Sequence, residues 1–137
     1  MLLLIAIPCT LDAIVVKLQL VNAGINCPNC SKYISQVHQT RSVLVRDLSI
    51  FGQVVYLKVP RRQFYCSTCK KSPTEPLLWV NRKQRQTNRY QEYIYERVKE
   101  LTVKQVSGNE KMSEDAVQDI FHKVASSKKK AGGILND

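Results

Sequence analysis

Two cysteine pairs carry the clearest chemistry in the sequence. Cys27 and Cys30 form one C-x₂-C pair, and Cys66 and Cys69 form a second. Two intervening residues allow a tight turn to aim both sulfurs at one point, so two such turns can supply four thiolates in a tetrahedron. Four thiolates favour Zn²⁺ and, less often, iron. The spacing therefore predicts one structural zinc ion, with buried unliganded thiols, disulfides and redox chemistry as the alternatives.

The segment between the two pairs can hold a β-hairpin. Residues 43–48 are typical of a strand, residues 49–52 offer a turn, and residues 54–65 alternate as a return strand would. An alternating pattern over residues 13–22 predicts a further strand that leads into the first pair. Together these elements predict a small zinc ribbon, in which an N-terminal strand and a hairpin bring the two pairs side by side.

The apolar amino terminus, residues 1–16, raises the alternatives of a membrane span or a signal peptide. As a helix it would reach about 24 Å, short of the ~30 Å core of a bilayer. A signal peptide has Lys or Arg ahead of its apolar stretch, and no Lys or Arg precedes the apolar run here. We therefore expect a short buried element, a cytoplasmic protein and no membrane partner. The fifth cysteine, Cys9, is expected to be a buried, unpaired side chain in a reducing compartment.

The positive charge of the chain is concentrated in its middle. The net charge is +10, and residues 41–104 contain 14 basic and 5 acidic residues. A basic stretch in a small zinc protein indicates phosphates and therefore nucleic acid, with a merely solvated surface as the alternative. The side chains expected to contact phosphates are Arg61, Arg62, Lys70, Lys71, Arg82, Lys83, Arg85 and Arg89.

The second half of the sequence has helical periodicity. An apolar stripe predicts a helix from residue 90 to about 101, with Asn88 in its cap. Thr102 can cap a short helix over 103–107, and Ser113 can cap another after a turn at 108–112. This pattern predicts a helix-turn-helix unit, with an ordinary helical hairpin as the alternative. The side chains expected to contact bases are Ser113, Gln118, His122 and Lys123.

The expected fold class is α+β. We expect a zinc-ribbon domain over residues 1–80 and a basic linker over residues 81–89. A helix-turn-helix-like helical domain follows over residues 90–127, and a disordered tail over residues 128–137.

Several motifs together resemble one protein family. They are the C-P-N-C knuckle at 27–30, the R-D-L-x₃-G-x₂-V-x-L hairpin at 46–57, the R-R-x-F-x-C-x-x-C approach at 61–69, V-K-Q-V at 103–106 and M-S-E-D-A-V-Q-x-I-F at 112–121. This order resembles the N-terminal region of bacterial insertion-sequence transposases of the IS-L-three type. The resemblance implies a zinc-binding module and a helix-turn-helix that recognise the terminal repeats of the element, ahead of an RNase-H-like catalytic domain.

The sequence also differs from the family pattern. Ser107 stands where the first helix commonly has Ala, and Lys111 stands where the turn commonly has Gly. The sequence stops at Asp137, where the catalytic domain would begin, so we expect no enzymatic activity and no small-molecule substrate. The expected partner is double-stranded DNA, together with self-association or a full-length transposase.

Two other functions stay open. One is a zinc-ribbon adaptor that binds RNA or protein in transcription or translation. The other is a thiol–disulfide enzyme, which would need a thioredoxin-like βαβ context that neither cysteine pair has.

Overall fold

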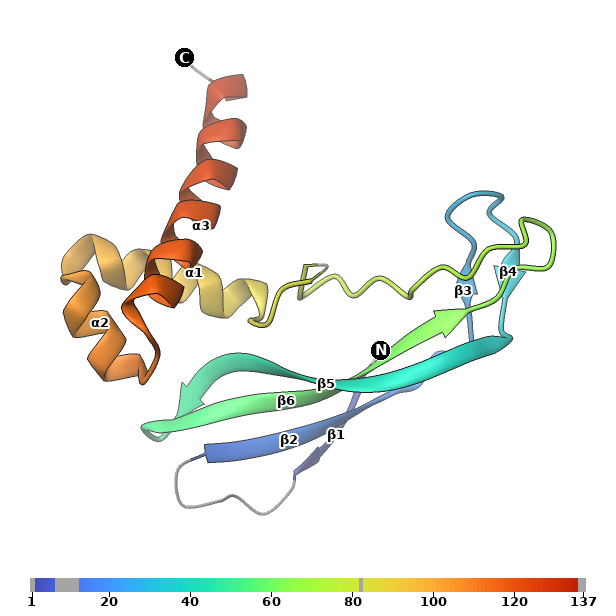
Figure 1. Ribbon diagram of the computed structural model, residues 1–137, viewed down its shortest axis with the longest axis horizontal. Helices are drawn as coiled ribbons and strands as arrows, with labels where there is room; N and C mark the ends of the chain where they lie inside the picture. Colours follow the sequence, from blue (N-terminus) through green and yellow to red (C-terminus); the bar gives the residue numbers. More distant parts are fainter. Residues whose placement is uncertain (1, 7–12, 82, 136–137) are drawn as a thin grey trace. The chain divides into compact units, whose positions relative to one another are not determined.

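The computed structural model describes residues 2–6, 13–81 and 83–135, so Cys9 and Arg82 lie outside the described residues. The chain separates into two compact units, Met1–Arg85 and Gln86–Asp137. Figure 1 shows that the first unit is built from strands and the second from helices. Residues 81–89, which we expected to form a linker, span this boundary. The fold class is α+β, as the sequence predicted.

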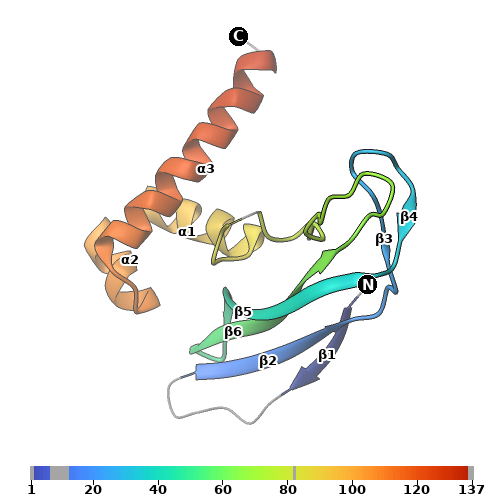
Figure 2. The same ribbon diagram turned by 45° about the vertical axis from the view of Figure 1, so that its right-hand side comes forward.

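The first unit is organised around a four-stranded sheet in the order β1-β2-β6-β5 (Figures 1 and 2). Its strands are β1 (Leu2–Ala6), β2 (Ala13–Leu20), β5 (Val37–Ile50) and β6 (Gln53–Phe64). β1 and β2 are antiparallel, as are β5 and β6, whereas β2 and β6 run parallel. The hairpin therefore occupies one half of the sheet, and the N-terminal strands extend it past β6.

Apolar alternation fixes the register of the long hairpin. Val43 lies opposite Val59 and Val45 lies opposite Leu57, so the same face of both strands is buried. At the tip, Phe51 and Gly52 both have positive φ, as a two-residue hairpin turn requires. The buried core of this unit is formed by Leu18, Val45, Val55, Leu57, Val59 and Val80.

A smaller hairpin carries the first cysteine pair. It consists of β3 (Ile25–Asn26) and β4 (Tyr33–Ile34), which pair antiparallel. The structure places β4 and the start of β5 within residues 31–39, which are mostly polar. The polar residues in this stretch form strand because β5 keeps its pairing with β6 up to Phe64, so that β6 ends beside the second cysteine pair.

After the second cysteine pair the chain returns along the β5–β6 hairpin. We name residues 74–81 and 83–85 the strap. Its first residue, Thr74, forms a bridge with Gln63 of β6, and its last carbonyl, that of Arg85, accepts a hydrogen bond of 2.8 Å from the Arg46 amide of β5. Between these two points, Val80 is buried against the sheet. The strap thus lies across the hairpin and is attached to it at both ends.

Three helices form the second unit: α1 (Asn88–Glu100), α2 (Val103–Glu110) and α3 (Glu114–Leu135). Thr102 caps α2, as the sequence predicted, and forms a capping box with Gln105, but α2 continues past the expected end at residue 107 to Glu110. The cap of α1 is Thr87 and not Asn88, because the Thr87 hydroxyl accepts from the Tyr90 amide. The buried side chains of the second unit include Tyr90, Ile94, Val106, Val117, Ile120 and Val124.

The third helix is longer than we expected. We predicted disorder from residue 128, but α3 continues to Leu135. One contact that extends it is the ion pair between Lys128 and Glu92 of α1, with 3.2 Å between nitrogen and oxygen. None of the described helices is both long enough and apolar enough to cross a membrane.

Candidate zinc site and nucleic-acid interface

The two cysteine pairs fold into turns with the same backbone geometry. In the first turn, the Ser31 amide donates to the Cys27 carbonyl at 2.8 Å and Ser31 has a φ of 63°. In the second, the Lys70 amide donates to the Cys66 carbonyl at 2.7 Å and Lys70 has a φ of 55°. The left-handed residue after each pair closes a tight loop around the sulfurs. The same local sequence pattern therefore produces the same knuckle twice.

The two knuckles bring all four sulfurs into one cluster. Every Sγ atom of Cys27, Cys30, Cys66 and Cys69 lies within 4.8 Å of the other three. Cys27 and Cys69 are 3.8 Å apart, and Cys30 and Cys66 are 3.6 Å apart. A tetrahedral zinc ion with Zn–S bonds of about 2.3 Å holds its ligands about 3.8 Å apart. The spacing of the sulfurs therefore fits a zinc ion at their centre.

The protonation of the sulfurs also favours a cation. The backbone amides of Cys30 and Asn29 stabilise the Cys27 thiolate and lower its pKa to about 6. The pKa of Cys69 is raised to about 12, because its thiol shares a hydrogen bond with the Cys30 sulfur and is desolvated. Four sulfurs this close cannot all carry a negative charge unaided. A bound Zn²⁺ compensates the charge and allows all four to be thiolates.

Apolar and polar contacts hold the knuckles in place. Cys27 and Cys66 are buried with Ile34 and Phe64 in a small apolar cluster. Beside this cluster, Arg62 forms a two-pronged pair with Glu75, with distances of 2.9 Å and 2.8 Å. Glu75 also accepts a hydrogen bond from the Asn22 side chain at 2.7 Å, and Arg62 donates to the Asn22 carbonyl at 3.0 Å.

This Arg62–Glu75–Asn22 contact, which we name the clamp, joins the chain before the first knuckle to the chain on either side of the second. Burial alone would raise the pKa of Glu75, but hydrogen bonds from Arg62 and Asn22 outweigh burial and hold the pKa below its usual value. The carboxylate therefore stays ionised. Arg62, which we expected to contact phosphate, is instead occupied by the clamp and by the Phe64 ring, 5.0 Å from its guanidinium.

The helical unit contains the expected helix-turn-helix arrangement in α2 and α3. Lys111 ends α2 in the left-handed conformation, with φ of 56° and ψ of 47°. The Ser107 hydroxyl donates to the Met112 carbonyl, and the Met112 amide donates to the Ser107 carbonyl at 3.2 Å. The two residues that differ from the family pattern thus shape the turn itself, because Ser107 ties its two ends together and Lys111 supplies the bend.

The expected nucleic-acid contacts fall into different environments. Lys70, Lys71, Lys83, Arg85 and Arg89 are exposed, and Arg61 is half-buried. On α3, Gln118, His122 and Lys123 are exposed. Ser113 has a structural role, because its hydroxyl accepts a hydrogen bond of 3.1 Å from the Ala116 amide and caps the helix.

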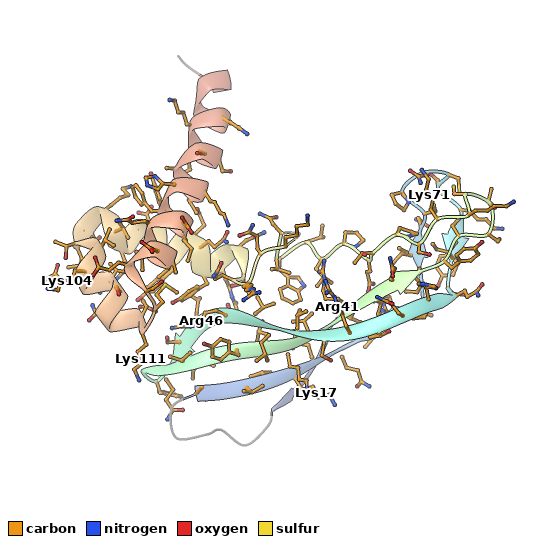
Figure 3. The ribbon with its side chains drawn as sticks, in the orientation of Figure 1. Lys17, Arg41, Arg46, Lys71, Lys104 and Lys111 are labelled. Carbon is orange, nitrogen blue, oxygen red and sulfur yellow. The ribbon has the colours of Figure 1, made fainter. Side chains whose placement is uncertain are left out.

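One basic residue in this region was missed by the sequence reasoning. Arg41 of β5 is exposed and lies directly opposite Arg61 of β6 in the strand register. Figure 3 labels Arg41 on the part of β5 that the strap passes. The residue is isolated in the sequence, and only the pairing of β5 with β6 brings it next to the other cations.

Two family models match the chain over most of its length. The zinc-finger of transposase IS204/IS1001/IS1096/IS1165 matches residues 23–69. The helix-turn-helix domain of transposase family ISL3 matches residues 75–125. The first match contains both knuckles and the β5–β6 hairpin, and the second contains the strap and the helix-turn-helix. With the four clustered sulfurs, the first match identifies the cysteine cluster as a structural zinc site.

A curated relative supports the same assignment. The transposase for insertion sequence element IS1001 of Bordetella parapertussis is 44% identical over 63 residues, which cover 46% of this chain and 16% of that protein. The chain therefore spans only a small part of the length of this relative. No solved structure matches the chain. On the two adjoining family matches and this relative, the chain contains the zinc-ribbon and helix-turn-helix domains of ISL3-family transposases.

Proposed function

We propose that the chain binds double-stranded DNA and recognises the terminal repeats of an insertion sequence. The observation that carries the proposal is the presence, in one basic chain, of adjoining ISL3 zinc-finger and helix-turn-helix domains. A transposase must locate the ends of its element before any strand is cut. A zinc-stabilised unit joined to a helix-turn-helix is suited to that task, because both are small modules that present side chains to a duplex.

In this proposal α3 is the helix that reads bases. Gln118, His122 and Lys123 are exposed, Gln118 and His122 lie one helical turn apart on the same face, and a Gln side chain can form paired hydrogen bonds with adenine. The acids Glu114 and Asp115 lie in the first turn of α3, where the positive end of the helix dipole stabilises their negative charges. Because these acids repel phosphates, we expect base contacts from the middle of α3 and not from its first turn.

Phosphate contacts in this proposal come mainly from the cationic residues around the knuckles and the strap. They are Arg61, Lys70, Lys71, Lys83 and Arg85. Arg89, at the start of α1, is a further candidate, and Arg82 lies outside the described residues. Contacts of this kind fix the position of a protein on DNA and supply salt-dependent affinity, whereas base contacts supply the sequence preference.

We further propose that strand cleavage is not an activity of this chain. The matched regions are those of a zinc finger and a helix-turn-helix, which bind DNA and do not cut it. Binding to a terminal repeat, alone or with a second transposase copy, would then be the contribution of this chain. We place that activity in the bacterial cytoplasm, where the thiol ligands stay reduced.

The direct test is a titration of the zinc-loaded chain against two duplexes, the terminal repeat that flanks its own gene and a scrambled duplex of the same composition. Fluorescence anisotropy at two salt concentrations measures both affinities. We expect the repeat to bind at least tenfold more tightly, with the ratio preserved at the higher salt because base contacts do not depend on counterion release. Equal affinities would refute end recognition, and stronger binding to a structured RNA would favour the adaptor function.

A further inference from the structure

We propose that a hollow in the zinc-ribbon unit, between the strap and the β5–β6 hairpin, is a binding site for the phosphate backbone of double-stranded DNA. The proposal rests on the proposed function and adds to it a specific place. In this proposal the first unit binds the duplex at its own site, and the helix-turn-helix is not the main source of affinity.

The hollow has the chemistry of an anion site. It encloses about 600 Å³, and its rim includes the four basic residues Arg41, Arg61, Lys83 and Arg85. None of the described residues that line it is acidic. The remaining lining consists of aliphatic side chains from the sheet and the strap, together with the amides Asn81 and Gln84 and the hydroxyl of Thr74. Cations, amides and a hydroxyl around a shallow apolar floor are suited to phosphate oxygens and the sugars between them.

The strand register adds an independent argument. Arg41 and Arg61 are direct partners across the β5–β6 hairpin, so their side chains leave the same face about 5 Å apart at the Cβ atoms. Like charges in this position destabilise a sheet. Lys83 and Arg85 of the strap bring two more positive charges to the same hollow. A phosphodiester anion would be attracted to this concentration of positive charge around one hollow.

The distribution of charge over the two units points the same way. Residues 1–85 contain 12 Lys or Arg and 3 Asp or Glu, whereas residues 86–137 contain 9 and 8. The first unit therefore has a net charge of +9 and the second a net charge of +1. Both acids among the described residues of the first unit, Asp47 and Glu75, are buried. The exposed surface described for this unit thus offers phosphates cations without competing carboxylates, while α3 of the second unit begins with two exposed acids.

A second pair of cations in the same unit provides a matched control. Lys17 of β2 lies opposite Lys58 of β6 in the strand register, and both are exposed. Neither residue lines the hollow. Replacing this pair removes the same charge from the same unit as replacing Arg41 and Arg85. A difference between the two replacements therefore reports the hollow and not the overall charge.

The experiment compares three zinc-loaded full-length chains: the wild type, Arg41→Gln/Arg85→Gln and Lys17→Gln/Lys58→Gln. Their affinity for one duplex is measured at several salt concentrations. Zinc content and the melting temperature establish that each variant is folded, which we expect because all four replaced residues are exposed. The Arg41→Gln/Arg85→Gln chain should bind on the order of tenfold more weakly near physiological salt. The slope of log K against log salt should become less steep by about 2, which is about 1 for each arginine removed. The Lys17→Gln/Lys58→Gln chain should stay within about threefold of the wild type.

The possible outcomes separate this inference from the proposed function. If the wild type binds DNA and the two variants lose affinity equally, or neither variant loses affinity, the hollow is not the site although the chain binds DNA. If the wild type binds no duplex, the proposed function fails and the inference fails with it. If a double-stranded RNA of the same sequence binds more tightly through the same two arginines, DNA is the wrong ligand for the hollow.

Discussion

Lys111 occupies a backbone position that favours glycine. A side chain in the left-handed conformation costs about 1 kcal/mol or more, whereas glycine adopts it without a steric penalty. Lys111 is exposed, so its side chain does not offset this cost by packing. We therefore predict that Lys111→Gly raises the free energy of unfolding of the helical unit by roughly 0.5–1 kcal/mol.

Chemical denaturation followed by circular dichroism at 222 nm measures this change. Lys111→Ala is the control, because it removes the same charge and keeps the conformational penalty. A gain in stability for alanine equal to that for glycine would show that charge, and not the backbone, limits the turn.

The clamp predicts a pH-dependent contribution to stability. Glu75 is buried and Arg62 is largely buried, with 6% and 14% of their side-chain surfaces exposed, and removing one partner of such a pair leaves an uncompensated charge that costs about 3 kcal/mol. Glu75→Gln should therefore destabilise the zinc-ribbon unit by about that amount at neutral pH. Because the folded pKa of Glu75 lies below 4.5, this difference from the wild type should be complete above about pH 5 and shrink as the pH falls through the folded value.

Urea denaturation of the two chains between pH 3 and 7 measures the difference, and because both chains share the same zinc ligands, acid release of zinc affects them alike. A difference that stays constant down to pH 3 would contradict an ionised Glu75 in the clamp.

At the scale of the elements, Gly24 governs the small hairpin that carries the first knuckle. A Cβ atom at this position would overlap the Ile34 carbonyl oxygen and lie 2.8 Å from the ring of Tyr33. The obstacle is backbone of β4, which cannot move without opening the hairpin. We predict that Gly24→Ala destabilises the hairpin by about 2 kcal/mol and lowers zinc affinity more than tenfold.

Competition with a chromophoric zinc chelator measures that affinity. Gly108→Ala is the control, since Gly108 is in α2 with open space around it and should gain slightly in stability. Unchanged zinc affinity in Gly24→Ala would mean that the hairpin does not position the first knuckle.

Among these elements, local sequence predicts some features and not others. The knuckles and the caps at Thr102 and Ser113 were predictable, because each depends on residues a few positions apart. The long hairpin was predictable from its alternation, except for the additional length of β5. The left-handed conformation of Lys111 was not, since lysine gives no signal for it.

Contacts distant in sequence were missed for a different reason. Arg62 was expected at phosphate because the sequence shows its charge but not Glu75, which reaches it only after the second knuckle reverses the chain. The parallel pairing of β2 with β6 and the meeting of Arg41 with Arg61 likewise depend on strand order, which the sequence pattern leaves undetermined. Tertiary pairing thus assigned these residues their roles.

At the scale of the whole molecule, each unit has its own source of stability. The zinc site and the clamp stabilise the first unit, whereas the second unit has a separate apolar core that contains the hydrogen bond of 2.8 Å from Tyr90 to Glu110. We predict that removing zinc with EDTA increases hydrogen exchange in residues 22–36 and 64–75 and leaves α1 to α3 nearly unchanged. Peptide-resolved mass spectrometry reads both sets together, and equal loss of protection in the helices would contradict separate stabilisation.

The central claim, that this chain recognises transposon ends, is tested most directly by a hydroxyl-radical footprint on a duplex containing one terminal repeat and its flanking sequence. The account predicts a protected stretch confined to the repeat, abolished when zinc is removed. The same fragment with its repeat scrambled should show no localised protection. Faint protection spread evenly along both fragments would contradict the account and leave only a basic zinc protein that binds DNA without preference.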